Sequence, residues 1–223
     1  MYCHKERFMK KIYLLLTALI LCFCFTANKA YGEDSQLWLT LRTKKSIHDW
    51  VSLTSDHELR LVKDVTKLGY LHTEVGLLFY LPKVDWLNVE INTRFLISSK
   101  WQVRPSIGII YKLPKIWNFI KFSDRFRFEL HFDETSFRKW RGRNRISIKL
   151  KLWENKDRSF YYNLSDEFFF TNQGIDENRL RTGLDYWAEK NIGFTFYYQL
   201  QVKRHFGFKY ANYCFGTEAF IKF

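Results

Sequence analysis

The sequence predicts an all-β chain that closes into an antiparallel up-and-down transmembrane barrel. Three observations lead to this fold class: apolar and polar residues alternate along most of the chain, tryptophans lie at the ends of the alternating runs, and an export leader precedes them. Its 223 residues are enough for one domain. Aromatic residues make up 19% and charged residues 26% of the chain, a mixture that argues against a disordered chain and against a helical membrane protein.

Residues 1–32 are the predicted signal peptide. Lys10 and Lys11 give a basic start, an uncharged run covers residues 12–25, and Ala30-Tyr31-Gly32 places small residues at positions −3 and −1 of a cleavage site after Gly32. The uncharged run is shorter than the ~20 apolar residues that a membrane-spanning helix needs. Met9 is an alternative true start, which would leave the leader pattern intact.

The mature chain, residues 33–223, is expected to be one outer-membrane barrel domain. It holds 31 basic and 22 acidic residues, a formal charge of +9, and a single cysteine, Cys214. One thiol excludes an internal disulfide framework. For an exported basic chain, nucleic acid is not an expected partner, whereas an anionic surface or solute is.

Alternating runs predict the strands in chain order. Leu37 to Thr43 is the first candidate, and an apolar series through Val51, Leu53, Leu59 and Leu61 marks the next. The clearest later runs cover residues 89–97, 126–132, 146–152, 180–186 and 194–202. Period-two alternation is typical of strands with one apolar and one polar face, and no segment after residue 33 has a helical period.

Tryptophan positions separate a transmembrane barrel from a soluble sandwich. A sandwich places its core tryptophan within a strand, whereas a bilayer interface selects amphipathic rings at strand ends. The tryptophans that begin or end candidate strands are expected to form an interface girdle: Trp50, Trp86, Trp117, Trp153 and Trp187.

The spacing of this girdle predicts the strand number. Successive intervals from Trp50 to the terminal Phe223 are 36, 31, 36, 34 and 36 residues, each long enough for two strands and a loop, which gives ten strands. Bacterial barrels are normally even-stranded. The count is therefore ten, with residues 37–43 outside the wall, or twelve, with one strand missed. The links at 134–142 and 171–177 are expected to be the longer, outward-facing loops.

The C-terminus supports the same compartment. Phe223 ends the chain, and Ile221 lies on the same face of the last predicted strand. This pattern resembles the signal that barrel-assembly machinery reads on last strands. A role in assembly is therefore expected for both residues.

Several short motifs in order also resemble a known family. They are Gln36-Leu37-Trp38, the run 125–129, the run 143–146, Asp166-Glu167 with three phenylalanines after it, and the run 176–184. Together they resemble the bacterial outer-membrane barrels catalogued as "domain of unknown function 2490", over nearly all of the mature chain. The resemblance implies an outer-membrane barrel and supplies no activity.

The lumen is where chemistry is expected. Alternation places an excess of basic over acidic side chains on the inner face, with the following residues predicted to line it: Arg94, Arg104, Arg125, Arg127, Glu129, Arg143, Arg145, Glu167, Arg179, Arg181 and Asp185. One hypothesis is a closed structural or interaction barrel in which these charges satisfy each other. The other is a small anion-preferring pore.

An enzyme is the alternative from another class. Ser55 and His57 interrupt an apolar strand face, and a hydroxyl beside an imidazole on a lipid-facing wall would suit acyl transfer or a lipase. No motif supports it. The six histidines are scattered, so no metal site is predicted, and no cofactor is expected.

The expected setting follows from these features. The protein is predicted to reside in the outer membrane of a Gram-negative-type envelope, in contact with the lipid bilayer and lipopolysaccharide. The barrel-assembly machinery is an expected partner, as are small anionic solutes, and a monomer is the default.

Overall fold

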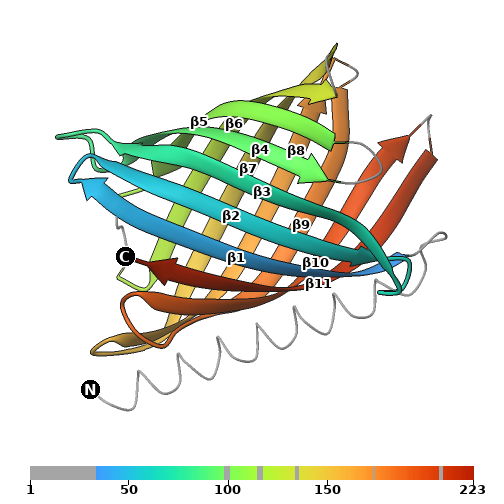
Figure 1. Ribbon diagram of the computed structural model, residues 1–223. Helices are drawn as coiled ribbons and strands as arrows, with labels where there is room; N and C mark the ends of the chain where they lie inside the picture. Colours follow the sequence, from blue (N-terminus) through green and yellow to red (C-terminus); the bar gives the residue numbers. More distant parts are fainter. Residues whose placement is uncertain (1–33, 98–100, 115–117, 134–135, 173, 206–207) are drawn as a thin grey trace.

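Eleven β-strands form one closed barrel in the computed structural model, which describes residues 34–97, 101–114, 118–133, 136–172, 174–205 and 208–223 (Figure 1). The strands are β1 (Asp34–His48), β2 (Val51–Val62), β3 (Lys67–Tyr80), β4 (Leu87–Ile97), β5 (Trp101–Lys112), β6 (Ile120–Asp133), β7 (Ser136–Asn155), β8 (Arg158–Thr171), β9 (Gly174–Trp187), β10 (Ile192–His205) and β11 (Phe208–Lys222). The predicted signal peptide, residues 1–32, lies outside the described part. Among described residues no helix is long and apolar enough to cross a membrane.

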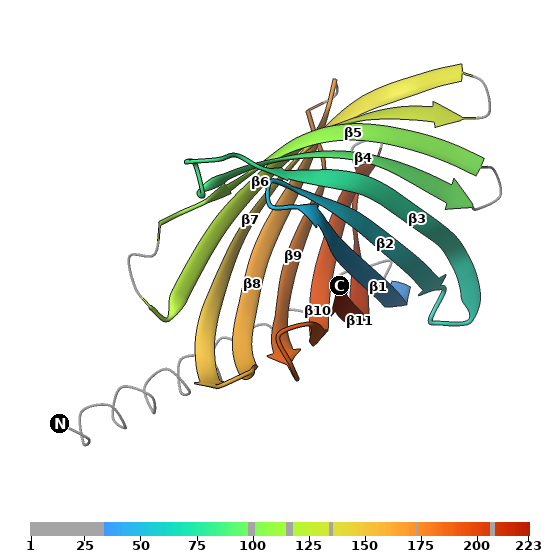
Figure 2. The same cartoon turned by 60° about the vertical axis from the view of Figure 1, so that its left-hand side comes forward.

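Each strand pairs antiparallel with the next one along the chain, and β1 closes the wall by pairing in parallel with β11 (Figures 1 and 2). The predicted fold class is confirmed. The described residues give eleven strands where the sequence predicts ten or twelve. The difference lies in residues 37–43, which pair with β2 on one side and with β11 on the other and therefore belong to the wall. A parallel closure accommodates an odd strand number.

We call the two ends of the barrel the N-terminal end and the C-terminal end, after the end of the described chain that lies at each. Asp34 and the β2–β3 turn lie at the N-terminal end, where Asp64 N–H donates to Asp34 Oδ1 at 3.0 Å. Phe223 and the β1–β2 and β9–β10 turns lie at the C-terminal end, where Phe223 N–H donates to the Lys44 carbonyl at 2.9 Å.

The expected long loops at the N-terminal end are largely strand. β7 already begins at Ser136 and β9 at Gly174. Polar residues caused the misassignment, because a charged side chain on an inner barrel face is polar without being a loop residue. Arg141, for example, pairs in register with Glu129 of β6.

The two faces of the wall differ as alternation requires. Outward side chains are apolar and exposed: Ile107 is 53% and Phe196 is 57% exposed. Their inward neighbours are polar and buried, such as Glu90 at 5% and Gln199 at 1%. A soluble protein would reverse this pattern, so the described wall fits a lipid environment.

One glycine allows a large ring to lie close against the inner wall. The Tyr197 ring occupies the space beside Gly216 of β11, where an added Cβ would lie 2.0 Å from the Tyr197 Cζ. Arg181 lies over the same ring, with its Cζ 3.8 Å from the ring centroid. Aromatic rings commonly fill the space that strand glycines leave.

Candidate functional site

The predicted lumen residues lie on the inner face of the barrel, where most of them line one cavity or pair across it. Arg94, Arg125, Arg127, Arg143, Arg145, Arg179 and Arg181 line a cavity of about 400 Å³. Glu129, Glu167 and Asp185 are buried at 2%, 4% and 3% exposure and accept charged hydrogen bonds. Arg104 donates to Gln102 Oε1 and has no ion pair among the described residues.

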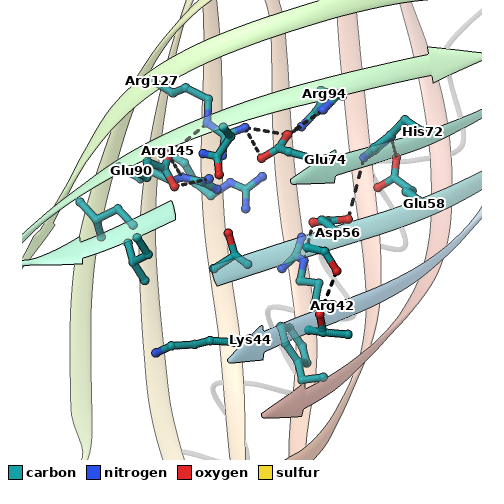
Figure 3. A pocket seen from close by; sticks show the side chains of 18 of the residues that line it. Arg42, Lys44, Asp56, Glu58, His72, Glu74, Glu90, Arg94, Arg127 and Arg145 are labelled. Carbon is teal, nitrogen blue, oxygen red and sulfur yellow. Dashed lines mark hydrogen bonds and ion pairs between the residues drawn. The ribbon is translucent and has the colours of Figure 1, made fainter. Parts of the chain in front are cut away.

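The middle of the cavity is crossed by ion pairs between strands that are not neighbours (Figure 3). Arg127 of β6 lies 2.8 Å from a Glu74 oxygen of β3 and 3.0 Å from a Glu90 oxygen of β4. Arg125 of β6 reaches Glu90 at 2.7 Å, and Glu74 also pairs with Arg94 of the neighbouring strand β4 at 2.6 Å. Because β5 separates β6 from β4 and both separate it from β3, the contacts of Arg125 and Arg127 pass through the lumen.

A second group of ion pairs follows β6, β7 and β8. Glu129 accepts hydrogen bonds from Arg141 at 2.7 Å and from Arg143 at 2.6 Å. Arg143 also donates to Glu167 at 2.8 Å, and Arg145 donates to the same carboxylate at 3.1 Å. Charge-assisted bonds of this kind are stronger than neutral ones, so this side of the lumen is densely cross-linked.

A third group lies at the parallel closure. Arg42 of β1 bridges Asp56 at 2.8 Å and Glu218 of β11 at 3.0 Å. Arg181 of β9 also reaches Glu218 at 2.6 Å. The ring of His72 lies near Asp56 in Figure 3, with Nε2 at 3.8 Å from its carboxylate. The unusual seam between β1 and β11 is therefore braced by charges inside the barrel.

Arginines and aromatic rings also stack across the lumen. The Arg60 guanidinium lies between Trp38 and Tyr70, with its Cζ 3.3 Å and 4.6 Å from the two ring centroids. Arg179 of β9 lies over the same Trp38 ring at 5.3 Å. Two strands separate β1 from β9 in the wall, so Trp38 extends into the lumen to meet this arginine.

The stack continues to the opposite wall. Arg179 also lies 4.5 Å from the ring centroid of Phe169 on β8, and Arg143 of β7 lies over that ring at 5.0 Å. Trp38 and Phe169 are 1% and 0% exposed. We call this set the arginine–aromatic stack: Tyr70, Arg60, Trp38, Arg179, Phe169 and Arg143. It fills the lumen in the half nearer the N-terminal end, since Trp38 is the fifth residue of β1 and Phe169 is two residues from the end of β8.

The cavity opens toward the other half and is strongly basic. Eleven lysine and arginine side chains line it against four carboxylates: Asp56, Glu58, Glu74 and Glu90. Two of the basic residues, Lys44 of β1 and Lys222 of β11, lie in the part of the wall nearest the C-terminal end. The described residues contain no group of three or more His, Cys, Asp and Glu side chains that could hold a metal ion.

The sequence did not predict several of the charged residues on the inner face, for two reasons. Arg42 and Lys44 were missed because their strand did not fit an even count. Arg141 and Glu177 were missed because their segments were expected to be loops. Trp38 lies on the same face as Arg42, so alternation through Leu37–Thr43 is the signal that finds all of β1.

The tryptophans of the predicted girdle lie in different positions in the structure. Trp50, Trp86 and Trp153 are 47%, 41% and 47% exposed at the C-terminal end. Trp117 lies outside the described residues. Trp187 departs from the expectation: its ring lies under the Lys222 ammonium, 4.0 Å away, and packs on Phe220, which lines the cavity. No bulge interrupts β9 between Asp185 and Trp187, so strict alternation keeps Trp187 on the same side as Asp185.

The C-terminal residues take part in closing the wall. Ile221 pairs in register with Ile192 of β10 and with Thr43 of β1. Phe223 follows β11 and is 73% exposed. Their expected role in assembly stays a prediction.

Ser55 and His57 lie on the outer face and belong to a hydrogen-bonded chain. Ser55 Oγ is 3.3 Å from His57 Nε2, and His57 Nδ1 is 3.1 Å from the Thr73 hydroxyl. Thr43 Oγ1 lies 2.8 Å from Ser55 Oγ. Acyl transfer also needs donors for the oxyanion. β2 is laddered to β1 and β3 along this whole stretch, so its backbone N–H groups already have partners.

Comparison with protein families gives one match to this barrel. The family model described as "Protein of unknown function (DUF2490)" matches residues 35–212. The chain belongs to this family. Among solved structures, the DUF2490 barrel is similar to one titled "NanC porin structure in rhombohedral crystal form", with a TM-score of 0.47 and 10% identity, over 81% of this chain and 95% of that chain. Comparison with curated proteins gives no match.

Proposed function

We propose that this DUF2490 protein is an outer-membrane barrel whose lumen is closed by its own side chains and which acts as a structural or interaction barrel. The arginine–aromatic stack is the observation that carries this proposal. It joins β3, β2, β1, β9, β8 and β7 in one continuous layer, so a solute moving along the lumen meets buried rings and paired guanidiniums.

The outer face supports the membrane location. A band of exposed apolar side chains surrounds the described wall, and tryptophans mark its C-terminal end. Bacterial barrels end their last strand in the periplasm, so we place the C-terminal end, with Phe223, on the periplasmic side. Because β1 pairs in parallel with β11, Asp34 then lies at the opposite end of the barrel. An exported precursor with cleavage after Gly32 fits this placement. N-terminal sequencing of the membrane fraction should find Glu33, and an intact leader in a soluble fraction would contradict it.

The anion-preferring pore is the second candidate, and the charge of the cavity favours it. Eleven basic against four acidic side chains would attract anions into a conducting lumen. The two candidates differ in whether the stack moves. A barrel whose stack opens would conduct anions, whereas a fixed stack would block all ions.

Single-channel recording separates the two candidates. Refolded wild-type protein in a planar bilayer should show no steady conductance. Trp38→Ala removes the ring that two arginines share, and it should produce openings that prefer anions. Trp50→Ala is the matched control, because it deletes an exposed tryptophan at the C-terminal end of the barrel without touching the stack. Steady wild-type conductance would overturn the closed barrel.

A further inference from the structure

Five lysines surround the lumen at the C-terminal end, and we call them the lysine mouth: Lys44, Lys112, Lys121, Lys149 and Lys222. They come from β1, β5, β6, β7 and β11 and are therefore brought together only by the barrel. Lys44 and Lys222 line the cavity, and the charges of Lys44, Lys121 and Lys149 all act on that of Lys222.

Two pairs of these lysines lie directly opposite each other in the ladder. Lys44 is in register with Lys222 across the parallel closure, and Lys121 is in register with Lys149 between β6 and β7. Like charges directly opposite each other destabilise a sheet. Such an arrangement at two places of the same mouth needs a reason other than stability.

The lysine mouth is nearly free of carboxylates. Lys149 reaches Asp185 at 2.5 Å, and no other member of the mouth has an ion pair among the described residues. The others rest on aromatic rings instead: Lys44 lies 4.9 Å from the Tyr80 centroid, Lys121 lies 4.5 Å from that of Tyr161, and Lys222 lies 4.0 Å from that of Trp187. The rings hold the ammonium groups without neutralising them.

The interior of the cavity continues this charge pattern. Arg42, Arg125 and Arg145 line it above the mouth, at 29%, 28% and 19% side-chain exposure. Arg125 and Arg145 are each bonded to one carboxylate and Arg42 to two, and each guanidinium has five N–H groups, more than these bonds use. A ligand entering the mouth would meet point charges first and directional donors behind them.

We propose that the lysine mouth and the cavity behind it bind a multivalent oxyanion, a compound carrying several phosphate or carboxylate groups, from the periplasmic side. Such a ligand would relieve the repulsion in both lysine pairs at once. A monovalent anion could not bridge them. The periplasmic location of the site rests on the proposed orientation of the barrel, but the binding does not depend on a closed lumen, because a site at one end can be filled whether or not the lumen conducts.

Titration calorimetry on the refolded barrel in neutral detergent tests the site, with inorganic tripolyphosphate as the probe. Wild-type protein should bind it, and added sodium chloride should weaken the binding by screening. The double variant K44Q/K222Q should bind roughly tenfold more weakly, because two charges that face the ligand at short range are removed. The matched control K63Q/K67Q removes two exposed lysines at the N-terminal end and should bind like the wild type.

Thermal unfolding gives a second readout, in which the variant that binds more weakly should be at least as stable as the wild type when no ligand is present. Without ligand, K44Q/K222Q should melt at the same temperature as the wild type or higher, since a repulsive pair is gone. Tripolyphosphate should raise the melting temperature of the wild type and hardly that of the variant. If the double variant does not refold, the single variant K121Q gives the same comparison with a smaller shift.

Two further probes identify the chemistry and its source. Citrate should bind as well if carboxylates suffice, and binding of tripolyphosphate alone would narrow the ligand to phosphates. Competition by phosphatidylglycerol in the micelle, lost in K44Q/K222Q, would assign the same site to lipid headgroups. Equal tripolyphosphate affinity in wild type and K44Q/K222Q, or no wild-type binding, would overturn the proposal. Conductance is not involved, so the proposed closed lumen is tested separately.

Discussion

The two halves of the lumen use different basic residues for different purposes. Toward the N-terminal end the interior is crossed by arginines, which are bonded to glutamates and stacked on Trp38 and Phe169. At the C-terminal end the lysine mouth has one ion pair and two repulsive registers. Arginine offers a planar fork that can bond a carboxylate and stack on a ring, whereas lysine is a flexible, strongly hydrated point charge.

This difference shows how one barrel can close its lumen with one set of basic residues and offer another set to an anionic ligand. Buried arginines are compensated within the protein, so they leave little charge for a solute. Exposed lysines without carboxylate partners keep their charge available. One half of the lumen is therefore built to hold its own side chains together, and the other half is built to meet an anion.

The largest effect should come from removing the central arginines. Replacing Arg125, Arg127, Arg143 and Arg145 together by glutamine leaves Glu90 without either of its arginine partners. Breaking a buried pair from one side costs about 3–5 kcal/mol, so the free energy of unfolding should fall by at least this amount. Urea unfolding, followed by heat-modifiable gel mobility, measures it.

The matched variant removes four charges from the other half. Glutamine at Lys44, Lys112, Lys121 and Lys222, which keeps the Lys149–Asp185 ion pair in place, should leave the free energy of unfolding unchanged or higher, because repulsion is relieved. Equal losses in the two quadruple variants would break the distinction between the halves. Reversal potentials in a salt gradient on the arginine variant would show whether it also changes any conductance.

The next largest effect tests the assignment of alternate residues to the lipid face and to the lumen face, which both halves share. Ile148→Arg places a charge on the outer face, between Phe122 and Leu164, and should cost about 2–4 kcal/mol if the site faces the bilayer midplane. Ser147→Arg at the same depth faces inward beside Ser123 and Ser165 and should cost less. Denaturant midpoints of the two variants give the comparison. Equal costs would favour two buried faces and no lipid contact.

The smallest effect exchanges the two basic residue types. Arg60→Lys keeps the charge but loses the plane that stacks between Trp38 and Tyr70, and it should destabilise by about 1–2 kcal/mol. Lys44→Arg, the reverse change in the mouth, should have little effect on stability. The two melting curves are the measurement. A larger loss at Lys44 would mean that lysine is the packed residue and would reverse the comparison.

Much of this architecture could be predicted from local patterns. Period-two alternation assigns each residue in a run such as Val89 to Ile97 to one face, because neighbouring side chains of a strand point in opposite directions. This places Arg125 and Glu129 inside before any partner is known. The girdle was predicted less well. A bulge between Lys151 and Trp153 turns Trp153 outward, whereas β9 has none near Trp187 and that ring stays inside.

The sequence by itself determined the fold class, the family and the sign of the inner charge, because each follows from composition and alternation along single strands. Only the tertiary structure decided the strand number, since the parallel pairing of β1 with β11 joins residues about 180 positions apart. It also decided which charges meet. Arg127 and Glu74, Trp38 and Arg179, and Lys44 and Lys222 come together through curvature and closure, and no local pattern carries that information.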